Sequence, residues 1–248
     1  MGDDQPAVRL EHVSKAFSGN KVLDDVSLQI GNGEAFCLLG RSGTGKSVTL
    51  KLMIGLIKPD KGSVRLYGDE IQKLDPAGLA EARKKVGFLF QNAALFDSIS
   101  VGENIAFPIR RHTRKPEDEI HRIVQEKLEE VELGKDGDKM PAQLSGGMKK
   151  RAGLARALAL DPHLLLIDEP SSGLDRITAD EIYQLLLQLK KKQKVTLVVV
   201  THDVMGARKF ADRFAVLDRG KIVACGSADE LARSDNSLVH NLAAGSET

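Results

Sequence analysis

The sequence predicts an α/β fold with a helical insertion, and three observations support this prediction. Residues 35–39 and 164–167 are continuous apolar runs, as in strands that are covered on both faces. A glycine-rich segment follows the first run and leads into a helical pattern that starts at Lys46, which is the order of an α/β unit. Residues 92–158 differ in character and are dominated by helical spacing.

The first third of the chain is predicted to be rich in strands. Apolar and polar residues alternate in two early segments, as in half-buried strands, and Asn20 and Lys21 form the expected turn between them. A second turn at 31–33 leads into the first apolar run. The elements expected in this part are strands at 8–10, 26–30, 35–39, 62–67 and 85–90 and a helix at 46–57.

The rest of the chain contains clear helix signals. Acidic residues 117–119 follow Pro116, where negative charge stabilises a helix N-terminus. Apolar residues then recur at helical spacing from Ile120 to Val131. The other expected elements are strands at 164–167, 197–200, 214–217 and 222–225, helices that open at capping boxes 178–181 and 227–230, and a frayed end at 243–248.

The composition is that of an ordinary globular protein, with 42% hydrophobic and 29% charged residues among 248. Lys and Arg number 36 against 35 Asp and Glu, so the net charge of +1 provides no basic field for nucleic acid. The acidic N-terminus does not resemble a signal peptide, and no run approaches the ~20 apolar residues of a membrane-spanning helix. We therefore expect a soluble protein that reaches a membrane only through a partner, with Cys37 and Cys225 as buried, reduced thiols.

A phosphate-binding loop is predicted directly after the first apolar run. Glycines let the backbone curl so that several N–H groups point at a phosphate, and the following helix adds the positive end of its dipole. Lys46 is expected to reach the terminal phosphates of a nucleotide, and the Ser47 hydroxyl is expected to bind Mg²⁺. The residues of this loop are Gly40, Arg41, Ser42, Gly43, Thr44, Gly45, Lys46 and Ser47.

Two carboxylates follow the second apolar run. A buried strand that ends beside a phosphate loop delivers an aspartate that helps to hold Mg²⁺, which predicts this role for Asp168. Glu169 is the candidate general base that polarises the attacking water. An Asp-Glu pair alone is typical of a solvated loop, and the phosphate loop upstream is what favours the catalytic interpretation.

A short glycine motif lies between the phosphate loop and the acidic strand, before a helix expected to begin near Lys149. In this position the motif resembles the signature motif of ABC transporter nucleotide-binding domains, and the resemblance extends from Val8 to Gly226. Met148 stands where many members have Gln, which implies that one polar contact to nucleotide is lost. The residues of the motif are Leu144, Ser145, Gly146, Gly147 and Met148.

The resemblance implies the ABC ATPase fold, which is a RecA-like P-loop NTPase core with a small antiparallel β subdomain and an inserted helical subdomain. We expect one ATP-binding domain over 1–248. Its parts are the core with the β subdomain at 7–91 and 159–226, the helical subdomain at 92–158, and a short C-terminal helix and tail at 227–248.

The resemblance also implies roles for residues outside these motifs. Phe17 is similar to the aromatic residue that stacks on adenine, and Gln91 is similar to the glutamine that reaches the metal. His202 is similar to the switch histidine that contacts the γ-phosphate. The loop that crosses the dimer interface in the family corresponds to Ser172, Gly173, Leu174 and Asp175. Each residue type also occurs in ordinary cores and loops, and the order of the motifs along the chain favours the functional roles.

In the family, the signature loop faces the phosphate loop of a second chain, which implies a homodimer that binds ATP and Mg²⁺ at its interface. The helix after Gly147 would offer its N-terminus to the γ-phosphate held by Lys46 of the partner subunit. Lys149, Lys150 and Arg151 come next, and we expect them either to meet that phosphate or to be solvated.

The resemblance further implies that integral membrane permease subunits receive the mechanical output, with this protein peripheral on the cytoplasmic side of the inner membrane. Leu95 and Phe96 are the expected apolar docking surface. The segments at 91–97 and 106–110 resemble those of ATPases from bacterial Mce/Mla-type lipid transporters. This likeness implies a lipid cargo and a lipid-binding Mce-type component.

Two other functions remain open, namely an ABC importer for a small polar solute and a soluble ABC ATPase that acts on nucleic acid or the ribosome. Relatives of the second kind carry long coiled coils, zinc-binding cysteines or a second cassette, and none of these occurs in the sequence. Co-purification with a permease and lipid, or with a solute-binding protein, would distinguish a lipid transporter from a solute importer.

Overall fold

The computed structural model describes residues 5–234 and 239, and within them the strands form two sheets. One sheet is antiparallel, in the order β2 (Asn20–Ile30), β1 (Val8–Phe17), β4 (Lys61–Leu66) and β5 (Asp69–Glu70). The other has the order β10 (Lys221–Gly226), β9 (Arg213–Asp218), β3 (Ala35–Leu39), β8 (Thr196–Thr201), β7 (Leu164–Asp168) and β6 (Val86–Leu89). Its strands from β9 to β6 are parallel, and β10 is antiparallel to β9.

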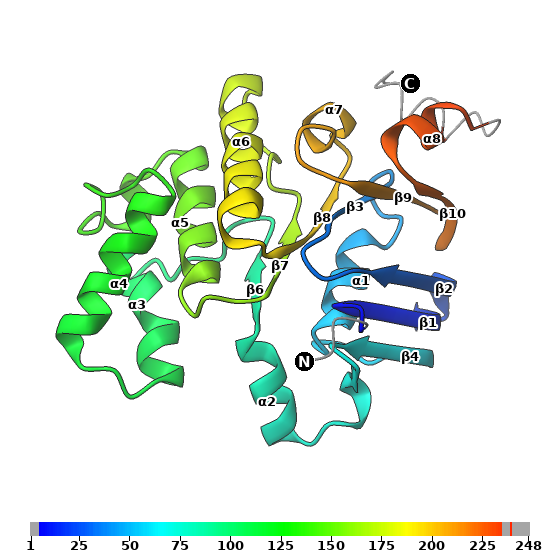
Figure 1. The fold of residues 1–248 in the computed structure, drawn as a ribbon, viewed down its shortest axis with the longest axis horizontal. Coiled ribbons are helices and arrows are strands. Elements are labelled where there is room, and N and C mark those ends of the chain that lie inside the picture. The colour runs from blue at the N-terminus through cyan, green and yellow to red at the C-terminus, as the bar shows by residue number, and fades with distance from the viewer. Residues whose placement is uncertain (1–4, 235–238, 240–248) are drawn as a thin grey trace.

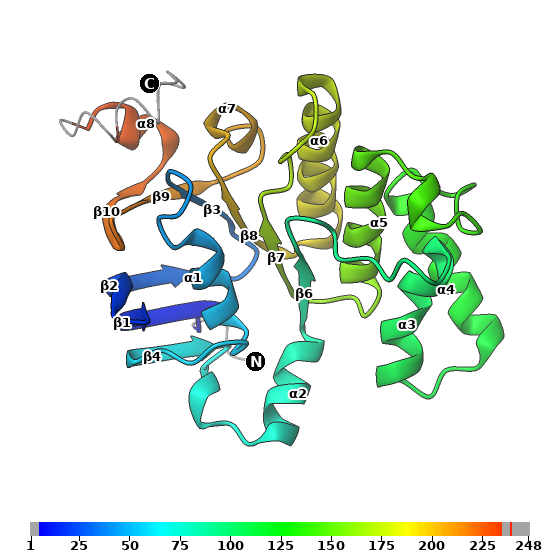
Figure 2. The same cartoon turned by 180° about the vertical axis from the view of Figure 1, so that it is seen from behind.

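The helices and the antiparallel sheet surround the parallel strands. Figures 1 and 2 show α3, α4 and α5 clustered on one side of these strands, and β1, β2 and β4 on the opposite side. The helical elements are α1 (Lys46–Met53), η1 (Ile71–Lys73), α2 (Pro76–Lys84), α3 (Val101–His112), α4 (Glu117–Glu130), η2 (Pro141–Gln143), α5 (Gly146–Leu158), α6 (Arg176–Gln193), α7 (Val204–Ala207) and α8 (Ala228–Ala232). None of the helices in the described part of the chain is both long enough and apolar enough to span a bilayer.

The parallel strands are covered on both faces, as their continuous apolar runs predict. Every residue of β3, β7 and β8 is buried. Successive side chains of a strand point to opposite faces. Phe36 and Leu38 accordingly join a core with α1 and the antiparallel sheet, whereas Cys37 and Leu39 join a second core with α3, α5 and α6. The predicted α/β class with a helical insertion is confirmed.

Two predictions in the first third of the chain are wrong in position. Asn20 and Lys21 belong to β2, and the turn lies at Ser18 and Gly19. Both turn residues have positive φ, 49° and 84°, as a type I′ hairpin requires. The first helix ends at Met53 instead of continuing to residue 57, because Gly55 takes a φ of 65° and its N–H bonds to the Leu52 carbonyl.

Two predicted helix starts are also wrong. The helix expected near Lys149 begins at Gly146, because the Ser145 hydroxyl accepts the Met148 N–H at 3.2 Å and caps it. The capping box expected at 178–181 does not open α6. Asp175 caps α6 instead, and its carboxylate accepts the N–H groups of Ile177 and Thr178 at 3.0 Å each.

Near the C-terminus, the capping box of Ser227 and Glu230 is confirmed as the start of α8. The prediction of a frayed end at 243–248 falls outside the described residues. Cys37 is buried as expected, but the expectation for Cys225 is wrong, because this thiol is exposed on β10.

Candidate active site

Three predicted motifs meet at one edge of the parallel sheet. The phosphate loop follows β3, Asp168 ends β7, and His202 follows β8, which lies between these two strands. Parallel strands present their carboxyl ends at the same edge, where open α/β sheets bind ligands. The strand order therefore assembles residues that are more than 120 positions apart in the sequence.

The phosphate loop has the conformation that its glycines permit. Gly43 and Gly45 have φ of 79° and 107°, and Gly45 precedes α1 without any side-chain cap. A Cβ at Gly40 would lie 2.5 Å from the Leu217 carbonyl oxygen, and a Cβ at Gly45 would lie 2.8 Å from Leu23. Because a side chain is excluded at both positions and the first N–H groups of α1 are not capped, the loop fits a phosphate chain.

Lys46 is the buried cation of this loop. Its residue is 6% exposed, and its Nζ donates to the carbonyl oxygens of Gly40 at 2.8 Å and Arg41 at 3.1 Å. The same Nζ lies 3.3 Å from Oε1 of Glu169. The side chain thus holds a positive charge between the phosphate loop and the end of β7.

Ser47 and Asp168 lie together as predicted, with the serine hydroxyl donating to Asp168 Oδ1 at 2.8 Å. Burial raises the pKa of Asp168, while the hydrogen bond from Ser47 opposes this shift. Hydroxyl and carboxylate oxygens are the hard donors that Mg²⁺ prefers, together with phosphate oxygens and water. No cluster of three or more His, Cys, Asp or Glu that could hold a metal occurs in the described part of the chain. The Ser47 hydroxyl and the Asp168 carboxylate together supply donors of the kind that Mg²⁺ takes.

Glu169 has a strained backbone and a tightly held side chain. Its φ is 46°, in the left-handed region, which costs about 1–3 kcal/mol for a residue other than glycine. Its N–H donates to the Val200 carbonyl at 2.9 Å. Its carboxylate lies between Lys46 and His202, whose Nδ1 is 2.9 Å from Oε2. This arrangement fixes a carboxylate beside the Lys46 ammonium of the phosphate loop.

The other predicted site residues come from other elements, and Gln91 and Ser172 are linked to Glu169 through hydrogen bonds from Lys150. Phe17 ends β1 and is 44% exposed, and Gln91 is exposed just after β6. The signature turn at 144–148 opens α5, and Figures 1 and 2 place β6, β7 and β8 between α5 and α1. A single chain therefore does not bring its signature turn to its own phosphate loop.

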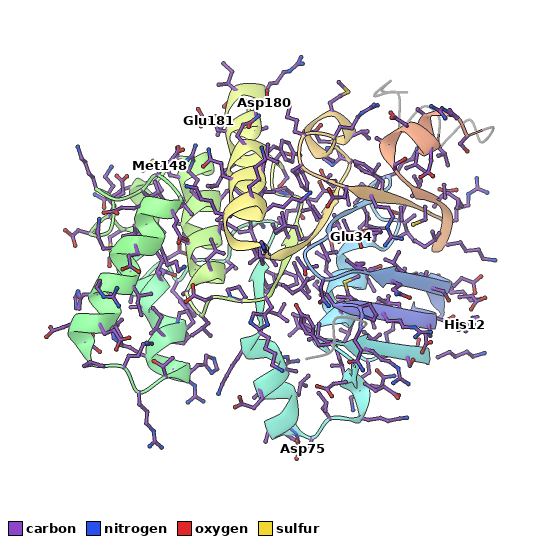
Figure 3. The ribbon with its side chains drawn as sticks, in the orientation of Figure 1. His12, Glu34, Asp75, Met148, Asp180 and Glu181 are labelled. Atoms are coloured by element: carbon purple, nitrogen blue, oxygen red, sulfur yellow. The ribbon has the colours of Figure 1, made fainter. Side chains whose placement is uncertain are left out.

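The signature turn packs against α6. A Cβ at Gly147 would lie 2.4 Å from the Thr178 methyl group, so this glycine permits the close approach of the two helices. Met148 is half-buried and packs against the core. Figure 3 shows Met148 at the same end of the molecule as Glu181 of α6. The interface loop 172–175 leads directly into α6 and is thereby joined to this end.

The expectation that the basic residues after Gly147 are solvated is wrong for Lys150 and Arg151, and the alternative, contact with a phosphate, stays a prediction. Lys150 is 5% exposed, and Arg151 is 8% exposed and pairs with Glu132 and Glu181 at 2.5 and 3.0 Å. Lys150 donates three hydrogen bonds to residues around Glu169. Sequence reasoning missed this role, because a lysine in a basic run has the appearance of a solvated residue.

A family model described as ABC transporter matches residues 23–172, more than half of the chain. The chain belongs to the ABC transporter family. The matched segment contains the phosphate loop, the turn at 144–148 and the carboxylates of Asp168 and Glu169 of this ABC ATPase, and it ends at Ser172.

Proteins with 40–44% identity to this ABC ATPase have different transport assignments. The probable ribonucleotide transport ATP-binding protein mkl of Mycobacterium leprae is 44% identical over 239 residues, which are 96% of this chain and 69% of mkl. The intermembrane phospholipid transport system ATP-binding protein MlaF of Haemophilus influenzae is 41% identical over 233 residues, 94% of this chain and 88% of MlaF. The methionine import ATP-binding protein MetN of Caulobacter vibrioides is 40% identical over 226 residues, 90% of this chain and 68% of MetN.

A solved structure of the ATP-binding cassette MJ0796, a dimer in a post-hydrolysis state with ADP and Pi, has the same fold. Its TM-score is 0.83 at 34% identity, over 89% of this chain and 98% of that chain. The predictions of the family, the ABC ATPase fold, ATP binding and ATPase activity are confirmed.

Proposed function

We propose that two copies of this ABC ATPase bind ATP and Mg²⁺ between them and drive a separate membrane permease. The observation that supports this proposal is that, within one chain, the signature turn lies apart from the phosphate loop. Each chain supplies Lys46 and Glu169 to one nucleotide and Ser145 to the other, so that two sites form only in a pair. ATP then stabilises the closed dimer, and hydrolysis weakens it.

In the proposed mechanism, Glu169 accepts a proton from the attacking water. Its carboxylate is oriented by Lys46 on one side and by His202 on the other. When bound, Mg²⁺ neutralises developing charge on the phosphates, and Ser47 and Asp168 would hold it. The helix dipole of α1 and the Lys46 ammonium stabilise the same charge from the protein side.

Replacing Glu169 by Gln tests the catalytic part of this proposal. A general base contributes ~10²- to 10⁴-fold, so turnover is expected to fall by that range while ATP affinity is retained. The variant is also expected to form an ATP-dependent dimer that persists in size-exclusion chromatography. Glu126→Gln, an exposed carboxylate on α4, is the matched control. Native turnover in Glu169→Gln would rule out Glu169 as the base.

We propose that the permease docks on an apolar surface formed by Phe96 and Phe107. These side chains are 44% and 48% exposed, and their ring centroids are 5.0 Å apart. Leu95, one of the two expected docking residues, packs against the core instead. The residue that lies beside Phe96 on the proposed surface is Phe107 of α3. Docking here would hold the protein peripherally at the inner membrane, on the cytoplasmic side.

We propose a lipid as the cargo and an Mce-type lipid-binding protein as a further component. The supporting observation is 41% identity to MlaF, an intermembrane phospholipid transport system ATP-binding protein, over 88% of its length. Import of a small polar solute is the alternative, since MetN, a methionine import protein, is 40% identical. Mass spectrometry of the tagged protein with its membrane partners would distinguish the two cargoes. A permease with bound lipid supports the proposal, and a solute-binding protein without lipid contradicts it.

A further inference from the structure

We propose that Lys150 is a positioning residue that couples the helix of the signature turn to the backbone of Glu169. The inference rests on the proposed role of Glu169 as the general base. It adds a physical connection inside one chain, between the surface proposed to meet the partner's nucleotide and the carboxylate proposed to act on the chain's own nucleotide.

The ammonium of Lys150 joins two segments, the residues after β6 and the loop between β7 and α6. Its Nζ donates to the carbonyl oxygen of Gln91 at 2.5 Å, to the carbonyl oxygen of Glu169 at 2.9 Å, and to the Ser172 hydroxyl at 3.0 Å. Gln91 follows β6, Glu169 follows β7, and Ser172 lies in the loop that leads to α6. A lysine ammonium has three N–H donors, and each has one acceptor here.

The buried ammonium of Lys150 is compensated by hydrogen bonds to neutral oxygens. Lys150 is 5% exposed, and burial lowers its pKa. Among the residues that the structure describes, no ion pair involves Lys150, so carbonyl and hydroxyl oxygens satisfy its charge. A buried charge is costly unless hydrogen bonds compensate it, and an apolar residue would fill this place without that cost. The cost indicates that the three contacts have a role of their own.

The contact to Glu169 acts on a strained part of the backbone. Glu169 has a φ of 46°, and its N–H donates to the Val200 carbonyl. Its C=O accepts from Lys150 Nζ at 2.9 Å and from the Ser172 N–H at 3.2 Å. Because φ and ψ set the direction of a side chain, these hydrogen bonds set where the Glu169 carboxylate points. Loss of Lys150 would leave the carbonyl with the Ser172 N–H as its donor and would also remove the Lys150 contact to the Ser172 hydroxyl. The residue could then relax and move its carboxylate relative to Lys46 and His202.

Helix α5 carries both ends of the proposed connection. Ser145 caps its N-terminus, and Lys150 lies about one turn further along the same rigid element. Arg156, two turns beyond, donates to the carbonyl oxygens of Ala93 and Ala94 at 2.7 Å each and holds the segment after Gln91 as well. A displacement of α5 when its N-terminus engages a nucleotide would therefore reach Glu169 through Lys150.

The test is Lys150→Met in the full chain, with Lys127→Met as the matched control. Lys127 is also 5% exposed and hydrogen-bonded, to Asp161 and Glu130, but it lies on α4 away from the site. A displacement near 1 Å can cost ~10²-fold in rate, so we expect kcat of Lys150→Met to fall by roughly 10- to 100-fold. The KM for ATP should stay within about 3-fold, because the phosphate loop is unchanged. Lys127→Met should lose thermal stability but keep kcat.

A double mutant separates positioning from a general loss of structure. If Lys150 acts through Glu169, adding Lys150→Met to Glu169→Gln should not slow single-turnover hydrolysis further. If the role is merely structural, the two losses should multiply. Lys150→Arg, which keeps the charge and several donors, should restore part of kcat. If Lys150→Met does not fold, Lys150→Gln takes its place in both measurements.

Three results would overturn the proposal: native kcat in the folded Lys150 variant, multiplicative losses in the double mutant, or a loss of ATP affinity equal to the loss of rate. The failure of the underlying function has a different signature. If Glu169→Gln itself hydrolyses ATP at the native rate, the assignment of the base fails. If Glu169→Gln is slow and Lys150→Met is fast, only the coupling through Lys150 fails.

Discussion

The contact between Gly206 of α7 and Tyr183 of α6 offers a quantitative test of packing beside the active site. Tyr183 is fully buried, its ring stacks on Phe210 with centroids 5.8 Å apart, and its hydroxyl is 2.8 Å from Ser171 Oγ. A Cβ added at Gly206 would lie 1.9 Å from Tyr183 Cε2 and 2.5 Å from Cδ2 and Cζ. Since ordinary contacts begin at 3.4 Å, the two helices would have to separate by about 1.5 Å.

Gly206→Ala should therefore destabilise the fold strongly. Overpacking costs typically about 1–3 kcal/mol, and the upper end applies because the ring is fully buried, stacked on Phe210 and held at its hydroxyl. For a chain of this size, about 3 kcal/mol corresponds to a fall in Tm of roughly 6–12 °C. The measurement is thermal unfolding followed by circular dichroism. Gly31→Ala is the control, because the nearest atom to its new Cβ is 3.4 Å away.

A compensating substitution shows whether the clash is the cause. Tyr183→Leu alone should also destabilise, because it removes the contact to Ser171 and leaves a cavity. In the double mutant the smaller side chain makes room for Ala at position 206, so the combined loss should be less than the sum of the two. The packing argument would be refuted if Gly206→Ala lowered the Tm by less than about 2 °C, or if the losses of stability in the double mutant were additive.

Three further predictions concern the site itself. Lys46→Ala should weaken ATP binding by roughly 10- to 100-fold, since a charge-assisted hydrogen bond contributes ~1.5–3 kcal/mol; unchanged affinity in isothermal titration calorimetry would contradict the assigned role. Burial raises the pKa of Asp168, so as the pH falls its carboxylate should take up a proton before a free aspartate does. Mg²⁺-dependent ATP binding should then weaken on acidification, and the loss should begin at a pH above that at which a free aspartate becomes protonated. If Asp168→Asn shows the same pH dependence of ATP binding as the native chain, this prediction is wrong. Ser145→Ala removes the cap of α5 and should cost ~1 kcal/mol, or about 2–4 °C in thermal unfolding, while a Tm equal to that of the native chain would argue against the capping role.

The sequence predicted the parts of the site that depend on chain order. The phosphate loop and Asp168 each follow a buried strand, so their convergence followed from the parallel arrangement alone. Helix starts were harder to predict, because several residues could cap α6 and local pattern does not show that Asp175 binds two N–H groups. Lys150 could not be recognised, because its burial depends on three acceptors that lie 19 to 59 positions away in the sequence. The subdomain boundaries at 92 and 158 stay a prediction.

The different surroundings of the two thiols have a practical consequence. Burial raises the pKa of both thiols, but Cys37 is fully buried in the middle of β3, whereas Cys225 is accessible on the edge strand β10. Alkylating reagents attack the thiolate of an accessible cysteine. A maleimide dye should therefore label the native protein at Cys225 alone, and the strand order separates β10 from β7, which ends in Asp168, by three intervening strands. The unaltered chain thus carries its own attachment point for fluorescence measurements of how two copies approach and separate.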